Sequence, residues 1–83
     1  MTLGEYRVGI SFNPSADDNV NQIKRAAADL IDLIAKVRAD KTERLDLGDQ
    51  ASEISRLCAL AMTHVEDGAM WAVKAATKGP MKP

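Results

Sequence analysis

The strongest hydrophobic pattern of the chain lies between residues 19 and 38. Apolar side chains recur there at alternating spacings of three and four residues: Val20, Ile23, Ala27, Leu30, Ile34 and Val37, with Ile31 and Leu33 beside them. This spacing places them along one side of an α-helix. Ser15, Asp17 or Asp18 can cap its N-terminus, and the aspartates suit the positive end of the helix dipole. The pattern therefore predicts a helix over residues 17–38.

A second helical pattern covers residues 49–78. Asp49 or Ser52 is expected to cap its N-terminus. The face expected to be buried comprises Ile54, Leu57, Ala61, Val65, Ala69 and Ala72, drifting toward Val73 and Ala76. Gly68 lies in the middle of this stretch, where glycine costs about 1 kcal/mol relative to alanine. A glycine in such a place indicates a neighbouring backbone or a ligand close to it, and of these we expect a neighbouring helix.

The remaining segments lack the helical pattern. Residues 39–48 are rich in charge and form the expected connection between the helices, and residues 79–83 begin with a Gly-Pro stop signal and form a short tail. In residues 1–16, four apolar or aromatic side chains alternate with smaller or polar ones: Tyr6, Val8, Ile10 and Phe12. A period of two indicates an extended segment, which must lie against the helices or a neighbouring subunit to pair its backbone. We therefore expect an extended N-terminal arm.

Together these elements predict one all-α domain over residues 1–83, a two-helix antiparallel hairpin with an extended N-terminal segment. Hydrophobic residues make up 46% of the 83 residues, yet only one Trp, one Tyr and one Phe are present, so the core must be aliphatic and rich in alanine. Each of two paired helices buries one face only, and the core of so small a domain is marginal. We therefore expect the chain to assemble into a homo-oligomer.

Charge and cysteine content limit the possible partners. The formal net charge is −1, which argues against a DNA or RNA polymer as partner because proteins that bind one favour a strongly basic face. A small anion needs only a few local cations. Cys58 is the single cysteine, so no disulfide can form within the chain, and a reducing compartment fits best. No apolar run approaches the roughly 18 residues of a membrane span, so we expect no membrane partner.

Residues that support catalysis or metal binding are sparse. His64 is the single histidine and fits no established spacing of metal ligands. Cys58 lies in an apolar run, as a small core residue does. Glu66 and Asp67 are adjacent, and neighbours on a helix diverge by about 100°. The five glycines are scattered rather than gathered in a phosphate loop. We therefore expect no catalytic residue, no metal, no cofactor and no enzymatic activity.

What remains is a set of cations and planar groups that can neutralise phosphates and stack on bases where a fold gathers them: Tyr6, Arg7, Phe12, Lys24, Arg25, Arg56, Trp71 and Lys74. Several also have a plain structural interpretation. Lys24 can be a solvated lysine, and Trp71 a core or interface anchor with Lys74 solvated beside it. Two i,i+4 ion pairs are expected on a solvated face of the first helix: Arg25 with Asp29, and Asp32 with Lys36.

Two short blocks of residues resemble a known family. The first, Asn21-Gln22-Ile23-Lys24, is similar to an Asn-Glu-Ile-Lys segment that opens the family's first long helix. The second follows the family's order of Arg-Trp, Thr, Gly-Phe-Met and Val-Arg-Ala: Arg56-Leu57, Thr63, Gly68, Met70, Val73, Lys74 and Ala75. In these blocks the chain resembles small phage proteins that sequester cyclic nucleotide signals of bacterial immunity, the anti-CBASS and anti-Thoeris sponges that share a helical hairpin domain.

The resemblance implies a binder that assembles into a homo-oligomer, commonly a hexamer, with pockets between subunits. Its cyclic dinucleotide site, formed by the N-terminal segment and the first helix, carries over to Tyr6, Arg7, Phe12, Asn13 and Lys24. Lys24 matches the family's lysine, and either Tyr6 or Phe12 supplies the stacking ring. Some members hold cyclic trinucleotides through an arginine and a threonine of the second helix, which are matched by Arg56 and Thr63.

Two residues depart from the family's pattern. Leu57 stands where a tryptophan is expected, and Ala69 stands where a phenylalanine is expected. These changes affect which cyclic nucleotide fits, or whether both sites are retained.

The sequence thus predicts a phage-encoded sponge that binds cyclic oligonucleotide second messengers without cleaving them. It would inhibit CBASS-type defence in the cytoplasm of the infected bacterium. The main alternative is a helical hairpin that oligomerises or docks on a partner protein and needs no ligand, which explains the amphipathic stripes equally well. A DNA-binding regulator is disfavoured by the net charge and by the absence of a helix-turn-helix spacing.

Overall fold

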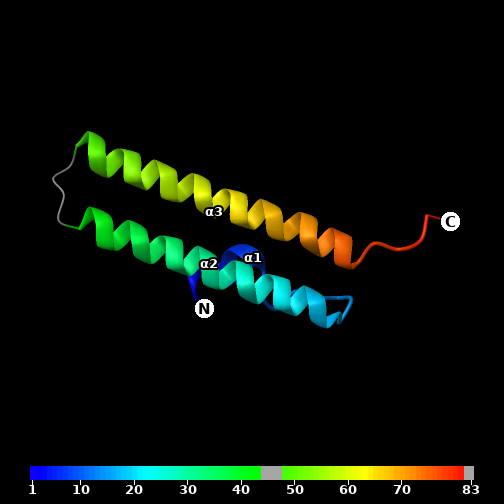
Figure 1. Cartoon of the computed structure of the whole chain (residues 1–83). Helices are drawn as coiled ribbons and strands as arrows, with labels where there is room; N and C mark the ends of the chain where they lie inside the picture. The colour runs from blue at the N-terminus through cyan, green and yellow to red at the C-terminus, as the bar shows by residue number, and fades with distance from the viewer. Residues whose placement is uncertain (44–47, 82–83) are drawn as a thin grey trace.

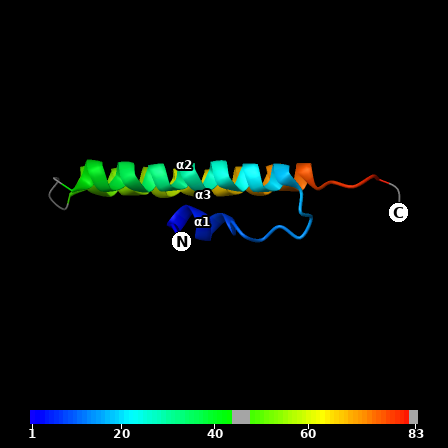
Figure 2. The ribbon, with the colours of Figure 1, turned by 90° about the horizontal axis from the view of Figure 1, so that it is seen from below.

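The computed structural model describes residues 1–43 and 48–81, and in these ranges the chain forms three helices and no strand. Helix α1 covers Leu3–Val8, α2 covers Asp18–Thr42 and α3 covers Asp49–Ala76. Helices α2 and α3 run antiparallel as a hairpin, and α1 lies against one face of it (Figure 1, Figure 2). The molecule is elongated, 57 × 24 × 13 Å. The predicted all-helical hairpin is confirmed.

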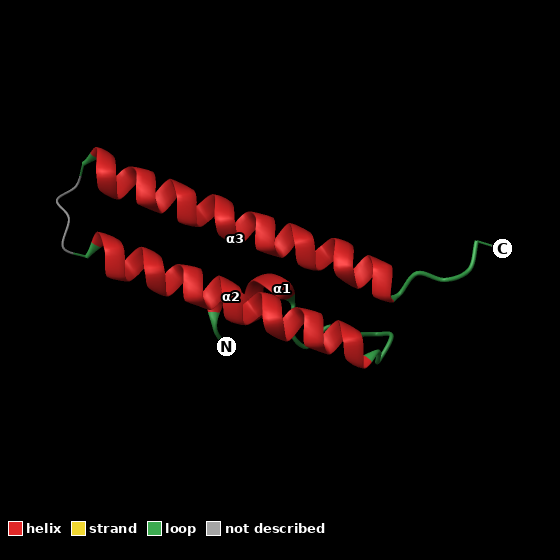
Figure 3. Ribbon diagram, in the orientation of Figure 1, coloured by secondary structure: helices red, strands yellow, loops and turns green. Residues whose placement is uncertain are grey.

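The N-terminal segment contains a helix, so the extended arm predicted for residues 1–16 is wrong over α1 (Figure 3). Thr2 and Glu5 form a capping box, in which the Thr2 hydroxyl accepts from the Glu5 N–H and the Glu5 carboxylate accepts from the Thr2 N–H. Gly9 ends the helix in the left-handed conformation, with φ 64° and ψ 57°. Both ends of α1 are therefore fixed by local interactions that the period of two did not reveal.

Helix α2 starts one residue after the predicted boundary and continues further than expected. Asp17, one of the three candidate caps, accepts a hydrogen bond from the Asn19 N–H at 2.7 Å. The helix runs on to Thr42, so residues 39–42 of the predicted connection are helical. Residues 44–47 of that connection lie outside the described residues.

Helix α3 begins at the predicted residue but is capped differently. Its N-cap is Gly48, which makes no side-chain capping hydrogen bond, so the predicted capping by Asp49 or Ser52 is wrong. The helix ends at Ala76, two residues before the predicted end. A Cβ added at Gly68 would meet nothing within 4 Å, so the helix predicted to press on this glycine does not come from this chain's described residues.

The buried seam between the two long helices is narrower than the predicted stripes. Its apolar residues are Val20, Ala27, Ala28 and Ile31 of α2 with Cys58 and Met62 of α3. Four residues predicted to be buried are instead 41–54% exposed: Leu30, Leu33, Val37 and Leu57. Leu30 lies about 200° around α2 from Ala28, which contacts α1. Leu33 and Val37 lie about 140° and 180° around α2 from Ala28, so these three α2 side chains belong to the face of the hairpin that α1 does not cover.

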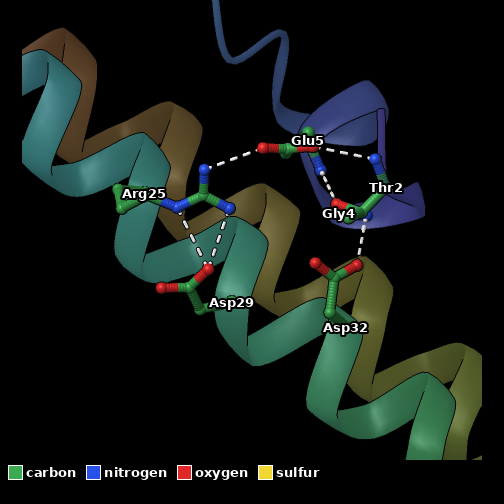
Figure 4. Close-up of polar contacts among 6 residues, drawn as sticks. All are labelled: Thr2, Gly4, Glu5, Arg25, Asp29 and Asp32. Atoms are coloured by element: carbon green, nitrogen blue, oxygen red, sulfur yellow. Dashed lines mark hydrogen bonds and ion pairs between the residues drawn. The ribbon is translucent and has the colours of Figure 1, made fainter.

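Helix α1 docks on α2 through a glycine. Gly4 is buried, and a Cβ there would lie 2.0 Å from the Ala28 carbonyl oxygen. The Gly4 N–H donates to an Asp32 carboxylate oxygen at 2.7 Å (Figure 4). Asp32 is thus used by α1, and Lys36 pairs with Asp40 at 2.7 Å instead, so the predicted Asp32–Lys36 pair is wrong.

Arg25 fixes α1 from a second position on α2. It forms ion pairs with Glu5 of α1 and with Asp29 of α2, each at 2.8 Å (Figure 4). The predicted Arg25–Asp29 pair is therefore confirmed. The hydrogen bond from Arg25, followed by the one from the Thr2 N–H, lowers the pKa of Glu5 to about 2. The Glu5 carboxylate therefore stays ionised, and available to Arg25, in mildly acidic solution.

Replacing Gly4 with alanine is expected to displace α1, because the new Cβ would collide with the Ala28 backbone. We expect the free energy of unfolding, measured by urea titration, to fall by about 1–3 kcal/mol. The control is Gly79→Ala, where an added Cβ meets nothing within 4 Å; its effect should stay within about 0.5 kcal/mol. Equal stability of the two variants would contradict this account of the docking.

Candidate functional site

Lys24 is the one buried charged residue within the described residues, at 7% exposure. Its Nζ donates to the Gly9 carbonyl oxygen at 2.9 Å and to the Phe12 carbonyl oxygen. The same atom lies 5.4 Å from the centroid of the Phe12 ring. Gly9 follows the last turn of α1, where helix carbonyls lack intrahelical donors and attract cations. The ammonium therefore ties the end of α1 and the following loop to α2.

The interpretation of Lys24 as a solvated lysine is therefore wrong. Lys24 lies on the same stripe of α2 as Val20, Ala27 and Ile31, at spacings of four, three and four residues. This stripe faces the seam, and the long side chain carries the ammonium from there to the loop after α1.

A groove of about 400 Å³ opens between α1 and the C-terminal half of α3, and we call it the α1–α3 groove. It is lined by Arg7, Val8, Lys24, Glu66, Ala69, Met70, Val73 and Lys74. Three cations and one carboxylate thus meet in a chain whose formal net charge is −1. The volume falls within the range of about 300–1,000 Å³ that is usual for small-molecule sites. The groove therefore has the size and the local positive charge that a small anion requires.

Arg7 is held in the α1–α3 groove by an ion pair. Its Nε donates to a Glu66 carboxylate oxygen at 3.0 Å, and the two side chains are 23% and 33% exposed. Only Nε takes part in this contact, so the two terminal guanidinium nitrogens of Arg7 have no protein partner among the described residues. A planar pair of N–H groups of this kind suits two oxygens of a phosphate.

A smaller cavity of about 210 Å³ lies beside the groove, and we call it the loop cavity. It is lined by Phe12, Asn13, Pro14, Ser15, Val20, Lys24, Val73 and Thr77. Asn13 fixes the turn that leads into α2, because its Nδ2 donates to the Asp17 carbonyl oxygen at 2.9 Å and to the Asn21 Oδ1 at 3.0 Å. Lys24 and Val73 line both cavities, so the two lie side by side.

The structure brings together four of the five residues predicted for the dinucleotide site. Arg7 lines the α1–α3 groove, Phe12 and Asn13 line the loop cavity, and Lys24 lines both. Tyr6 lines neither and is 74% exposed. Phe12 is 70% exposed and stands over the Lys24 ammonium. Within one chain, Phe12 is therefore the better placed of the two candidate stacking rings.

The two residues predicted for a trinucleotide site lie elsewhere on α3. Arg56 and Thr63 are both exposed and line neither cavity. Arg56 pairs with Glu53, one turn earlier on the same helix. Seven residues separate Arg56 from Thr63, which places them on one side of α3 about 10 Å apart along its axis. Within one chain, the structure does not bring them together.

Sequence analysis named Lys74 as a candidate cation but did not place this part of α3 in the dinucleotide site. Met70, Val73 and Lys74 follow one another at spacings of three and one residues, which places them on adjoining sides of the helix. That spacing was visible in the sequence, but nothing local indicated that α1 would lie opposite them.

Trp71, interpreted as a core or interface anchor, is 62% exposed within this chain and stacks under the Lys74 ammonium, 5.3 Å from the ring centroid.

Other candidate chemistry finds no support in the part of the chain that the structure describes. Cys58 is free and buried in the seam, as predicted for a small core residue. Across residues 1–43 and 48–81, no three His, Cys, Asp or Glu side chains gather as metal ligands do. In the same ranges, no helix has the length and apolar character needed to cross a membrane.

Comparison with known proteins matches the chain to a family model described as "Acb2/Tad1, hairpin domain" over residues 5–77. The matched range includes every residue that lines the α1–α3 groove and the loop cavity. No curated protein and no solved structure matches the chain.

Replacing Lys24 with alanine is expected to release the loop after α1. We expect the free energy of unfolding to fall by about 1–3 kcal/mol. Amide exchange should become faster at Ile10 and Phe12, whose N–H groups are hydrogen-bonded within this segment. The control is Lys36→Ala, which removes an exposed lysine of the same helix. Unchanged exchange at Ile10 and Phe12 in Lys24→Ala would show that the ammonium does not hold the segment.

Proposed function

Because the chain belongs to the Acb2/Tad1 hairpin-domain family, we propose that it binds cyclic dinucleotide immune messengers and sequesters them intact. The hairpin domain of this family is a domain of cyclic nucleotide sponges. The family is known as a binding sponge rather than as an enzyme. Acting in the cytoplasm of an infected bacterium, a phage protein of this kind would keep the messenger from its effector and so inhibit CBASS-type defence.

One observation carries the proposal: Arg7, Lys24 and the Phe12 ring lie together where α1 meets the hairpin. A cyclic dinucleotide carries two phosphodiesters and two bases. The free guanidinium nitrogens of Arg7 suit a phosphodiester, and the exposed Phe12 ring suits a base. Stacking of a base on an aromatic ring is worth about 1–3 kcal/mol. A nanomolar Kd requires about −12 kcal/mol, so one open groove is not enough.

Assembly of several copies would supply the missing enclosure, and we propose that the chain forms a homo-oligomer, with a hexamer as the state that the family resemblance implies. Helix α1 covers one face of the hairpin and leaves the other bare (Figure 2). Large apolar side chains on the hairpin are 41–54% exposed: Leu30, Leu33, Val37, Leu57 and Leu60. A second copy packed on the bare face would remove the α2 side chains among them from water and stabilise the small core.

A trinucleotide site at Arg56 and Thr63 is part of the proposal only across a subunit boundary, because the two residues share no cavity within one chain. The proposal includes no DNA or RNA polymer and no membrane as partner. The alternative function, a ligand-free interaction module, is favoured by the same exposed apolar face.

Isothermal calorimetry of the pure protein tests the proposed function. The ligand panel contains cyclic di-AMP, cyclic di-GMP, cyclic GMP–AMP, cyclic tri-AMP and cyclic isomers of ADP-ribose. We expect at least one cyclic dinucleotide to bind and to raise the melting temperature, because a ligand that binds only the folded state stabilises it. Chromatography should recover that ligand unchanged. Binding of no ligand, with no shift in melting temperature, would contradict the proposal and favour the interaction module.

Replacing Leu33 with glutamate is expected to dissociate the oligomer, because it buries a charge in the proposed contact. Sedimentation velocity should show a lower mass for Leu33→Glu than for the wild-type protein. The control is Leu3→Glu, which makes the same change at a leucine that is 48% exposed on α1, and it should sediment as the wild type does. A monomeric wild-type protein would contradict the proposed assembly.

A further inference from the structure

We propose that α3 supplies the second half of the phosphodiester site in the α1–α3 groove, with Lys74 as a phosphate-binding residue and Glu66 as a residue that disfavours terminal phosphates. This inference rests on the proposed function and deepens it. It assigns ligand contacts to a helix that the sequence had given no part in dinucleotide binding. It also states which class of nucleotide the groove selects.

The three cations of the groove differ in what their donors already do. The Lys24 ammonium donates to two backbone carbonyl groups. Arg7 donates to Glu66 through Nε, and its two terminal guanidinium nitrogens have no protein partner among the described residues. Lys74 makes no hydrogen bond and no ion pair with any described residue, and its side chain lines the groove. The donors available to an anion are therefore those of Arg7, from α1, and those of Lys74, from α3.

Trp71 limits the positions that the Lys74 ammonium takes up. The Lys74 Nζ lies 5.3 Å from the centroid of the Trp71 ring, while Trp71 itself lies outside the groove lining. A cation–π contact at an exposed site is worth about 0.5–1 kcal/mol. A lysine that is already ordered loses less conformational freedom when it binds an anion. The ring therefore prepares Lys74 for a ligand.

The wall between the two cations is apolar and suits a base rather than a bare phosphate. Val8, Ala69, Met70 and Val73 line the groove beside Arg7 and Lys74. Met70 is 65% exposed, and its polarizable thioether makes favourable contacts with planar rings. Cations next to an apolar wall fit an anion that is joined to a planar group, as each phosphodiester of a cyclic dinucleotide is.

Glu66 makes the groove selective for the charge of the phosphate. Its carboxylate lies beside Arg7, within the same lining. A phosphodiester carries a single negative charge, whereas a terminal phosphate carries about −1.5 to −2 at pH 7. The repulsion from Glu66 is therefore greater for a terminal phosphate. Cyclic dinucleotides contain only phosphodiesters, and their linear cleavage products end in a terminal phosphate, so Glu66 penalises the cleaved form more than the intact messenger.

Calorimetry of charge-removing variants tests the role of Lys74. The probe is whichever of cyclic di-AMP, cyclic di-GMP and cyclic GMP–AMP binds the wild-type protein most tightly. Lys74→Gln should raise its Kd by about tenfold or more, the effect of losing one charge-assisted contact. Lys78→Gln removes an exposed lysine that lies outside the groove lining and should stay within about twofold of the wild type. The fluorescence of Trp71, the single tryptophan, should change when the probe binds.

The same titrations separate the inference from the proposed function. Binding of the probe to Lys74→Gln with wild-type affinity would overturn the role of Lys74 and leave the proposed function standing. A wild-type protein that binds no member of the nucleotide panel would instead overturn the proposed function itself, and this inference with it.

A second comparison tests the role of Glu66. The ligands are the same cyclic dinucleotide and its linear form with one terminal phosphate. Glu66→Gln, which keeps an oxygen that can accept from Arg7, should lower the ratio of the Kd for the linear form to the Kd for the cyclic form by about threefold or more relative to the wild type. A ratio of the two Kd values that is the same in Glu66→Gln and in the wild type would overturn the role of Glu66.

Discussion

The buried ammonium of Lys24 is the interaction on which the rest of this structure depends. A charged group taken out of water is costly unless hydrogen bonds replace those it made to water. In this chain two backbone carbonyl oxygens, of Gly9 and Phe12, accept from Lys24, and the Phe12 ring lies over it. Both carbonyl oxygens lie on the segment between the end of α1 and α2. The same contact therefore holds that segment and forms a wall of both cavities.

The other contacts of α1 hold the N-terminal half of the same small helix. Gly4 permits backbone-to-backbone approach to Ala28, and Arg25 pairs with Glu5. Because α1 is held on one face of the hairpin, the two faces differ in character (Figure 2). One carries the groove with its cations. The other carries exposed leucines and valine, which suit assembly. The groove and the exposed apolar side chains of α2 are therefore separate surfaces of the hairpin.

The sequence predicted the long helices well because their periodicity extends over many turns. Helix α1 has only six residues, too few for a periodic signal, and a chance alternation of apolar residues indicated a strand. The signals that would have found α1 were local ones, the Thr2 and Glu5 capping box and the glycine at position 9. The burial of Lys24 was also visible in part, since it shares the spacing of Val20 and Ala27. The pairing of Arg7 with Glu66 could not be predicted from the sequence, because it joins residues 59 positions apart that only the tertiary fold brings together.

We propose that a cyclic dinucleotide binds in the α1–α3 groove, between a helix held by Lys24 and the C-terminal half of α3. A titration followed by two-dimensional ¹H–¹⁵N NMR tests it most directly, with the tightest-binding cyclic dinucleotide as ligand. The account predicts that the largest changes in amide shift occur at Arg7, Val8, Met70 and Lys74. Changes confined to Arg56, Thr63 and their neighbours, with the groove residues unmoved, would contradict it.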